Sequence, residues 1–375
     1  MTASLREILP STAALLGVPG ATDSLELTSY GAHRVVVVLV DGLGLHLLPQ
    51  LAPHAPLLAS VLNGGTGRLQ ALESTFPSTT PTSLVTLGTG VTPGEHGVLG
   101  FTLNVPGTDR TLTHILWRDS PDPATWQPVP TWFERCTAAG VGATAVLPAE
   151  FEGSGLTQAA HRGARFAPVR DGEDAAVRIA QEWERPGTRL VFGYTPDLDR
   201  AMHVHGIASP QWQQAAADVD AFLTRLVERM PADTMLLVTA DHGGLDIGPD
   251  GRVDLADEPI LRAGVRVVAG EPRVRYLHTV DGAREDVLAA WRERFGPAAH
   301  VQTREEAVAA GRFGPVTDQH LPRVGDVVVT CRADTAVFDS DREPAEVATL
   351  VGLHGADSAV ETAIPLIAIG PDAGR

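Results

Sequence analysis

The sequence has few cysteines, few basic residues and no long apolar run. Its two cysteines, Cys136 and Cys331, lie far apart in the 375-residue chain. A disulfide framework is therefore not expected. A reducing compartment is expected instead. The 29 basic residues are outnumbered by 46 acidic ones, which gives a net charge of -17. This balance provides no electrostatic surface for a nucleic-acid polymer or an anionic membrane.

Membrane and export signals are also lacking. No stretch approaches the roughly 18 apolar residues of a membrane helix. The segment from Met1 to Gly20 has no basic region followed by a sustained apolar run, so no signal peptide is expected. We therefore expect a cytoplasmic protein without a membrane partner, and the sequence leaves its oligomeric state open. A phosphate substrate stays possible, because bound divalent cations can reverse the charge of an acidic site.

Short apolar runs alternate with helical patterns along the chain. Residues 34–40 read RVVVVLV, a β-branched run typical of a strand buried on both faces of a parallel sheet. An amphipathic helix is predicted at 211–230. The alternation predicts an α/β sandwich, with a mostly parallel central β-sheet flanked by helices. Further strands are predicted at 143–147, 188–194, 235–239, 326–330 and 364–369.

The region after the predicted strand at 235–239 is less regular. A strand at 274–278 and a helix at 282–295 are predicted there, within a stretch rich in glycine and proline. We expect residues 249–325 to form a smaller inserted cap. Residues 1–248 and 326–375 would then form the catalytic core.

Polar residues follow the predicted strands. Asp41 ends the first strand, although an Asp-Gly pair is by itself an ordinary turn. Asp199 and His203 are four residues apart, so a helical turn would place both on one face. Residue chemistry alone also leaves Asp197 open as the ligand. A carboxylate and an imidazole in this arrangement can form half of a metal site.

Two further segments carry possible metal ligands. Asp241 and His242 are adjacent at a strand end, where the turning chain lets both side chains converge on one ion. Oxygen and nitrogen ligands together suit Zn²⁺, with Mn²⁺ or Fe²⁺ possible. His354 lies between glycines that allow close backbone approach. Taken singly, Asp241 and His242 could instead be part of a polar loop, and a lone histidine in a glycine-rich loop is usually an ordinary loop residue.

A hydroxyl-rich segment, Ser78-Thr79-Thr80, precedes Pro81 and reads as the start of a helix. A hydroxyl at a helix N-terminus faces backbone N–H groups and the positive end of the helix dipole. That position favours a bound phosphate and a developing alkoxide. The spacing does not separate Thr79 from Thr80.

In this order, the motifs resemble those of the alkaline phosphatase superfamily, and within it the nucleotide pyrophosphatase/phosphodiesterase family. The resemblance covers residues 35–369. Its pattern is an Asp after the first strand, a Pro-Ser-x-Thr segment, an Asp-x-x-x-His, an Asp-His-Gly and a late His-Gly. The resemblance implies that Thr80 is the nucleophile rather than Thr79, and that Asp199 is a ligand rather than Asp197.

The same resemblance implies two divalent metal ions, with Zn²⁺ as the first expectation. One ion would be held by Asp41, Asp241 and His242 and would touch Thr80. The other would be held by Asp199, His203 and His354. The implied activity is hydrolysis of a small-molecule phosphate ester, at a phosphodiester or nucleotide pyrophosphate bond, through a phosphothreonine intermediate.

The sequence departs from the family at two substrate-facing positions. Pro81 stands where an aromatic residue commonly follows the nucleophile, and Phe101 stands where the family has an asparagine that binds a phosphate oxygen. Asn104 is close in sequence and is our predicted substitute. These departures bear on nucleotide specificity and leave the metal residues unchanged.

Other functions compete with this one. A phosphomonoesterase or phosphonate hydrolase could use the same metals, and Arg110, Arg118 and Arg200 are candidates to bind an additional charge. A non-catalytic binding protein would be expected to lack ligands or the nucleophile, and none is missing. The inserted region could be a partner-binding module, but its charged helix reads more simply as a solvated face.

Overall fold

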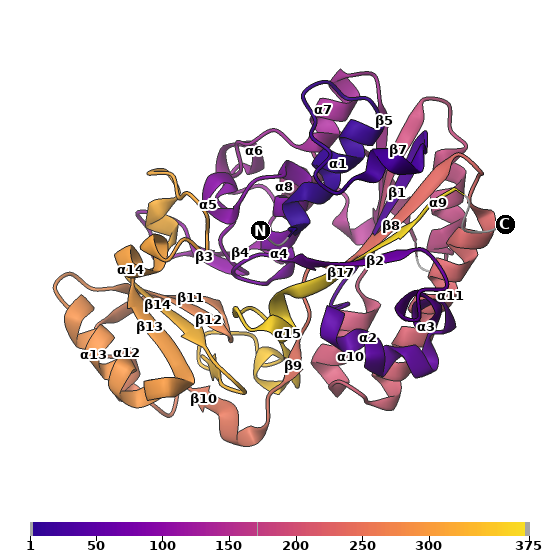
Figure 1. Ribbon diagram of the computed structural model, residues 1–375. Coiled ribbons are helices and arrows are strands. Elements are labelled where there is room, and N and C mark those ends of the chain that lie inside the picture. The colour runs from indigo at the N-terminus through magenta and orange to yellow at the C-terminus, as the bar shows by residue number, and fades with distance from the viewer. Residues whose placement is uncertain (1–2, 171, 372–375) are drawn as a thin grey trace.

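The computed structural model describes residues 3–170 and 172–371, and its main body is built on a seven-stranded sheet (Figure 1). The strand order is β2-β17-β8-β1-β7-β5-β6. Five neighbouring strands, from β8 to β6, are parallel, and β17 runs antiparallel to both β8 and β2. The prediction of a mostly parallel sheet is therefore confirmed. The strands are β1 (Arg34–Val40), β2 (Arg68–Glu73), β5 (Gly142–Pro148), β6 (Arg165–Val169), β7 (Thr188–Thr195), β8 (Thr234–Thr239) and β17 (Ala363–Ile369).

Strand β1 occupies the centre of the sheet, between β7 and β8. Its residues are buried from Val35 to Val40. Val37 pairs with Phe192 on one side and Leu237 on the other. Burial on both faces explains why this segment is continuously apolar rather than alternating.

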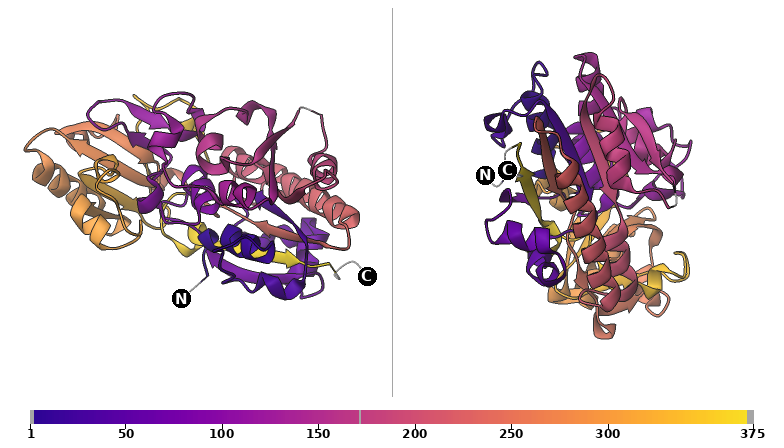
Figure 2. Two further views of the ribbon diagram at one scale, coloured as in Figure 1. Left: turned by 90° about the horizontal axis from the view of Figure 1, so that it is seen from above. Right: turned by 90° about the vertical axis from the view of Figure 1, so that its right-hand side faces the viewer.

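Helices cover both faces of the sheet, as the right-handed crossovers between parallel strands require (Figure 2). One face is covered by α1 (Ile8–Leu15), α4 (Thr80–Thr89), α7 (Trp132–Ala138) and α8 (Gly155–His161). The opposite face is covered by α2 (Leu48–Leu51), α3 (Pro56–Leu62), α9 (Ala175–Trp183), α10 (Asp197–His205) and α11 (Pro210–Arg229).

Short elements lie beside the sheet, toward the rest of the chain. They are α5 (Pro93–His96), α6 (Pro123–Trp126), the hairpin of β3 (Thr102–Asn104) and β4 (Thr111–Thr113), the pair of β9 (Leu245–Asp246) and β16 (Gly352–Leu353), and α15 (Ala359–Thr362).

A smaller lobe, residues 252–338, stands beside the main body (Figure 1). Its antiparallel sheet has the order β11-β12-β14-β13. These strands are β11 (Val265–Glu271), β12 (Val274–Thr279), β13 (Ala299–Thr303) and β14 (Val327–Cys331). The lobe also contains α12 (Pro259–Arg262), α13 (Arg284–Phe295), α14 (Arg304–Ala309) and the parallel pair of β10 (Arg252–Asp254) and β15 (Ala336–Phe338).

The boundary expected at residue 325 cuts through this lobe, because β14 pairs with β12 and β13 rather than with the main sheet. Val328 packs into the core of the main body, whereas Val327 and Val329 pack into the lobe's own core. The strand is thus apolar on both faces, as a strand of the main sheet would be. That likeness explains why the sequence pattern assigned it to the main body.

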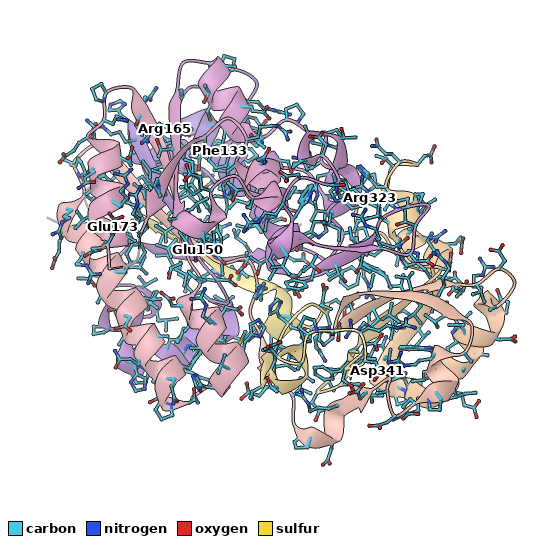
Figure 3. The ribbon with its side chains drawn as sticks, turned by 180° about the vertical axis from the view of Figure 1, so that it is seen from behind. Phe133, Glu150, Arg165, Glu173, Arg323 and Asp341 are labelled. Atoms are coloured by element: carbon cyan, nitrogen blue, oxygen red, sulfur yellow. The ribbon has the colours of Figure 1, made fainter. Side chains whose placement is uncertain are left out.

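The lobe is joined to the main body by buried contacts as well as by the chain. Arg323 donates from Nη1 to the carbonyls of Gly97 and Trp126, at 2.7 and 2.9 Å, and its guanidinium lies 3.7 Å above the Trp126 ring. Figure 3 shows Arg323 near the junction, with Glu150 in the main body. These contacts hold the two parts together.

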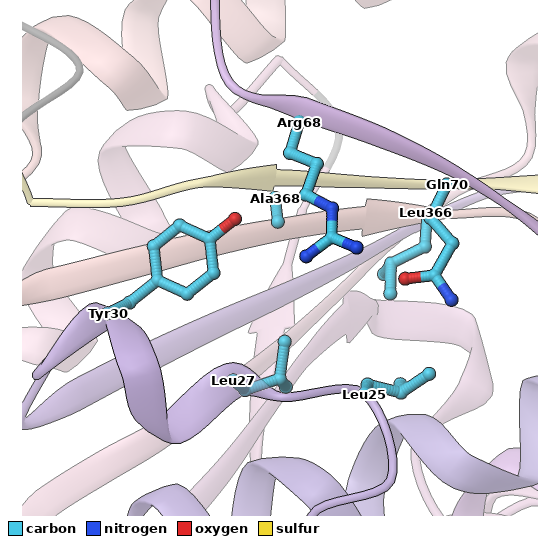
Figure 4. Close-up of a pocket in the computed structure, with 7 residues that line it drawn as sticks. All are labelled: Leu25, Leu27, Tyr30, Arg68, Gln70, Leu366 and Ala368. Carbon is cyan, nitrogen blue, oxygen red and sulfur yellow. The ribbon is translucent and has the colours of Figure 1, made fainter.

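None of the described helices is long and apolar enough to span a membrane. A small hollow beside β2 and β17 contains none of the predicted site residues (Figure 4). Its lining residues are Leu25, Leu27, Tyr30, Arg68, Gln70, Leu366 and Ala368.

Candidate metal and nucleophile site

The three predicted aspartates follow three neighbouring strands. Asp41 comes directly after β1, Asp241 comes two residues after β8, and Asp199 lies in the first turn of α10, after β7. Strands β8, β1 and β7 are adjacent and parallel. Their carboxyl ends therefore meet at one edge of the sheet, where open α/β sheets bind their ligands.

The first group of possible ligands is Asp41, Asp241 and His242, whose ligand atoms all lie within 4.8 Å of one another. His242 Nε2 is 3.4 Å from Asp41 Oδ1 and 3.5 Å from Asp241 Oδ2. Both carboxylate oxygens are buried without a hydrogen-bond partner among the described residues. Two ligands at about 2.0–2.1 Å from a tetrahedral ion stand roughly 3.3 Å apart, so this geometry fits a metal better than direct hydrogen bonds.

The second group is Asp199, His203 and His354. His203 Nε2 is 3.0 Å from Asp199 Oδ2, and His354 Nε2 is 3.9 Å from Asp199 Oδ1. Oδ1 of Asp199 is a third buried oxygen with no hydrogen-bond partner in the described part of the chain. The aspartate therefore offers one oxygen to each histidine, as a ligand shared around one ion would.

All three histidines are held in the same way. Each donates a hydrogen bond from Nδ1 to a backbone carbonyl, which leaves Nε2 directed into its group. Histidines that bind metals are commonly oriented by such a bond to their other nitrogen. The carbonyls belong to Gly243 for His242 (2.9 Å), Gly352 for His203 (2.7 Å) and Ser78 for His354 (2.8 Å).

The two groups are in contact with each other. The rings of His242 and His354 stack with centroids 3.5 Å apart and planes 14° from parallel. One histidine comes from each group, so the two candidate ion positions lie side by side. Paired ions at short separation are the arrangement that clamps both oxygens of a phosphoryl displacement.

The buried acidic side chains of the site make it electrostatically favourable for a cation. Burial raises the pKa of Asp41 well above its ordinary value, and the charges of Asp241 and Asp199 raise it further. Burial alone would lower the pKa of His203, but the neighbouring Asp199 raises it to about 9. Carboxylates that repel each other, and an aspartate that raises the pKa of a neighbouring imidazole, both indicate a negative potential that a bound cation would neutralise. The donor set therefore fits two divalent ions.

Thr80 is the first residue of α4 and lies against the first group. Since Nδ1 of His242 carries the proton, Nε2 accepts, and the Thr80 hydroxyl donates to it at 3.2 Å. The neighbouring Thr79 side-chain oxygen is fully buried with no partner among the described residues. Thr80 is thus the hydroxyl that contacts a candidate metal ligand.

Glycines let the strand-end loops approach each other closely. Gly42 has a φ of 73°, and a Cβ there would lie 3.0 Å from the Cβ of Asp199. Its N–H donates to Asp241 Oδ1 at 3.1 Å. A Cβ on Gly243 would lie 2.2 Å from the Val360 carbonyl oxygen, so a larger residue would push the His242 loop away. The glycines after Asp41 and His242 are thus required by packing.

The family model for type I phosphodiesterase / nucleotide pyrophosphatase matches residues 35–357. The chain belongs to this family. Its members are pyrophosphatase and phosphodiesterase hydrolases that depend on divalent metals. The match spans every residue of both candidate metal groups and Thr80.

Individual relatives are distant. An uncharacterised pyrophosphatase/phosphodiesterase of Schizosaccharomyces pombe is 23% identical over 224 residues, which cover 58% of this chain and 46% of that protein. The chain thus spans about half the length of this relative. Murine ectonucleotide pyrophosphatase/phosphodiesterase 5 has a similar structure, with a TM-score of 0.73 at 19% identity over 90% of this chain and 88% of that one.

A second solved structure of the same fold is phosphonoacetate hydrolase from Sinorhizobium meliloti in complex with phosphonoformate. It matches with a TM-score of 0.67 at 19% identity, over 89% of this chain and 90% of that chain. At these identities the likeness shows the fold alone. The alkaline-phosphatase-like architecture expected from the sequence is confirmed.

The family pattern did not indicate Tyr194, which the structure places beside Asp41. Its hydroxyl donates to Asp41 Oδ2. Tyr194 lies near the end of β7, at the same sheet edge as the aspartates. Tyr194 is the last residue of the predicted strand at 188–194, and this position was the signal in the sequence for a place at the site. A tyrosine there also fits an ordinary buried strand.

Asn104 does not join the metal residues. Its amide donates to the carbonyls of Thr108 and Arg110, at 2.8 and 3.1 Å, and so closes the hairpin of β3 and β4. It lines a separate hollow beside Asp326 rather than the one above Thr80. Phe101, at the family's asparagine position, does line the hollow above Thr80. A substrate contact by Asn104 remains a prediction without support from this geometry.

Proposed function

We propose that the chain hydrolyses phosphate esters of small molecules, with phosphodiesters or nucleotide pyrophosphates as its substrates. The observation that supports this most is the position of the Thr80 hydroxyl, which contacts His242 where two metal-binding groups meet. Thr80 and candidate ligands from both groups line one hollow, which opens between the main body and the smaller lobe. The match to the family supports the same chemistry.

The proposed ligands are the two groups described above. Their mixture of carboxylate oxygens and imidazole nitrogens suits Zn²⁺ best, and Mn²⁺ or Fe²⁺ would also fit. When bound, two divalent ions would supply charge stabilisation to the attacking and leaving oxygens. Asp41, Asp241 and His242 would hold the ion next to Thr80. Asp199, His203 and His354 would hold the other.

In the proposed mechanism, Thr80 Oγ1 forms a bond to phosphorus while the bond to the leaving oxygen breaks. The Thr80 hydroxyl loses its proton in this step, and the leaving oxygen takes up a proton, so that the leaving group departs as an alcohol or a phosphate. Water then attacks the phosphothreonine, breaks the bond to Oγ1 and restores the hydroxyl. Thr80 begins α4, and the positive end of the helix dipole there would favour a phosphoryl oxygen.

A phosphonate hydrolase or phosphomonoesterase is the second candidate. The similar fold of a phosphonoacetate hydrolase favours it. Arg118 and Arg200 line the hollow and could meet an additional negative charge, whereas Arg110 is not among its lining residues. Relative rates on bis-p-nitrophenyl phosphate, p-nitrophenyl phosphate and phosphonoacetate would decide between the candidates.

Replacement of Thr80 tests the proposed nucleophile. Thr80→Ala should lower turnover of bis-p-nitrophenyl phosphate by about 10³-fold or more, because it removes the attacking oxygen. Thr80→Ser should retain measurable turnover, because it keeps the hydroxyl. Both variants should contain as much metal as the wild type. Near-wild-type turnover by fully metallated Thr80→Ala would show that Thr80 is not the nucleophile.

The proposed compartment is the cytoplasm. Its support is that Cys136 and Cys331 are both buried as free thiols. Burial raises the pKa of each thiol to about 11, so neither is poised to form a disulfide.

A further inference from the structure

The hollow above Thr80 is much larger than a phosphoryl group needs. It encloses about 960 Å³, within the range of sites that bury a whole organic ligand. Thr80 and the ligands Asp41, Asp199, His203 and His354 occupy one part of its wall. The remaining wall must therefore face whatever is attached to phosphorus.

Part of that remaining wall is aliphatic, beside charged residues such as Arg118, Arg200 and Glu343. The aliphatic part includes Ile115 and Leu116 after β4, Val204 on α10, Val268 on β11 and Leu350 before β16. Val204 directly follows the candidate ligand His203, so the apolar surface begins at the metal site. Both the main body and the smaller lobe contribute to it.

Several of these side chains are exposed, which is unfavourable unless a ligand covers them. Leu116 is 69% exposed, Val204 54% and Ile115 50%. Of the six exposed large apolar residues in the described chain, these three line the same hollow. Single exposed apolar residues are ordinary, but a cluster at a concave site marks a binding surface.

Ile115 and Leu116 lie after β4 in a segment whose flanking residues are buried and held by hydrogen bonds. On one side, His114 is buried and its Nδ1 donates to the Phe101 carbonyl at 3.1 Å. On the other side, Trp117 is buried and its Nε1 donates to the Pro121 carbonyl at 2.8 Å. The residues flanking Ile115 and Leu116 are thus fixed inside, and the pair is held outward.

Phe151 and Tyr194, which line the hollow together with Phe101, do not form a parallel slot for a nucleobase. The rings of Phe151 and Tyr194 pack against each other, with centroids 6.1 Å apart and planes tilted by 58°. The Tyr194 hydroxyl is occupied by Asp41. Pro81, which follows Thr80, is buried in α4. Among the described lining residues, no aromatic pair forms a parallel slot.

We propose that the organic group attached to the substrate phosphorus is aliphatic, and that Ile115, Leu116 and Val204 bind it. This inference rests on the phosphoesterase function proposed above and names the substrate class of the same site. Each methylene buried on this wall should improve kcat/KM by up to about fourfold.

Alkyl p-nitrophenyl phosphate diesters test the proposal, because the leaving group stays constant while the alkyl group grows. With metal-loaded wild type, kcat/KM should rise at least about tenfold from the methyl to the hexyl ester. The thymidine 5′-phosphate p-nitrophenyl ester should be a poorer substrate than the hexyl ester. A flat alkyl series, or preference for the thymidine ester, would overturn the inference.

Leu116→Ser tests the wall directly, with Ile260→Ser as the matched control. Ile260 is 63% exposed but does not line the hollow, so both changes remove an exposed apolar side chain. Leu116→Ser should lower the ratio of kcat/KM for the hexyl ester to kcat/KM for the methyl ester about fivefold. Ile260→Ser should leave this ratio unchanged. Equal effects of the two variants would contradict a ligand role for Leu116.

Calorimetry separates this inference from the proposed function. Hexylphosphonate should bind metal-loaded Thr80→Ala at least about tenfold more tightly than methylphosphonate does. If the wild type hydrolysed no ester but kept this preference, the proposed function would fail and the aliphatic site would stand. If esters were hydrolysed but the two phosphonates bound equally, the aliphatic site would fail alone.

Discussion

At the scale of single residues, the proposed site depends on groups that hold the ligands as well as on the ligands. Tyr194 donates to Asp41 Oδ2, while Oδ1 of Asp41 faces His242 without a hydrogen bond. One carboxylate oxygen is thus fixed by the protein and the other is left for an ion. Residues in this supporting position commonly affect metal affinity tenfold or more.

Tyr194→Phe should therefore weaken zinc binding at the Asp41 group by about tenfold, because it frees the carboxylate to rotate. Competition with a chromophoric chelator would measure the two zinc affinities. Tyr30→Phe is the control, since Tyr30 lines the small hollow beside β17, away from the candidate ligands (Figure 4). If Tyr194→Phe bound zinc as the wild type does, Tyr194 would have no positioning role.

The candidate ligands could be proposed from the sequence because their types and order carry chemical information. Asp241 and His242 are adjacent in the chain, and Asp199 and His203 share a helix face, so local spacing alone could pair them. The carbonyls that orient the histidines could not be predicted, since every residue has one and only the fold selects Gly352 or Ser78. Asn104 is the opposite case. It is close to Phe101 in sequence, but the fold does not bring it near Thr80.

At the scale of secondary-structure elements, one buried ion pair connects the lobe to the loops that carry candidate metal ligands. Arg273, between β11 and β12, forms a bidentate pair with Glu361 of α15, at 3.0 and 2.9 Å, and neither side chain is exposed. Glu361 Oε1 accepts from the Ala356 N–H, and its carbonyl accepts from the Gly243 N–H. Glu361 therefore braces the loops that carry His354 and His242.

Removing one partner should be costly, because the other charge stays buried. Glu361→Ala should lower the free energy of unfolding by about 3–5 kcal/mol and reduce the metal content of the purified protein. Arg284→Ala is the control, since it breaks an exposed ion pair with Glu305 and should cost less than about 1 kcal/mol. Chemical denaturation and elemental analysis would measure both effects. Similar losses in the two variants would contradict the bracing role.

Element prediction succeeded where an apolar pattern had one structural meaning. Strands β1, β5, β7, β8 and β17 begin and end within one residue of their predicted bounds. Strand β14 was assigned to the wrong sheet because burial between two cores gives the same pattern as a central parallel strand. The pattern of apolar residues indicates which faces of a strand are buried. It carries no information on which hydrophobic core covers those faces.

At the scale of the whole molecule, buried neutral histidines make stability depend on pH. Burial lowers the pKa of His114 and of His161 from 6.5 to about 4 in each case. His114 Nε2 accepts from Trp126 Nε1 at 3.2 Å, which requires the neutral ring. His161 packs against Phe192, with ring centroids 4.7 Å apart. Both sites therefore exclude the imidazolium form.

The sign of the pH effect follows from these shifts. Below pH 6.5 the unfolded chain binds protons at both histidines, whereas the folded chain does so only near pH 4. Stability should be fully present above pH 6.5 and fall as the pH drops toward 4, by about 3 kcal/mol per histidine. Urea unfolding in chelator at pH 7.5, 6 and 5 would measure it.

Two variants separate this effect from general acid unfolding. His161→Leu should flatten the pH dependence between pH 6.5 and 4, because the unfolded chain then binds one proton fewer. His54→Leu, at an exposed position, should leave the dependence unchanged. Equal pH dependence in wild type and His161→Leu would contradict the assignment.

The metal content of the whole protein tests the central claim most directly. Protein stripped with chelator, reloaded with zinc and freed of excess should hold two ions per chain by elemental mass spectrometry. Asp241→Ala and Asp199→Ala should each hold about one, because each removes a ligand from a different group. Two ions in the wild type and one in each variant would match the proposed site. One ion or none in fully loaded wild type would contradict it.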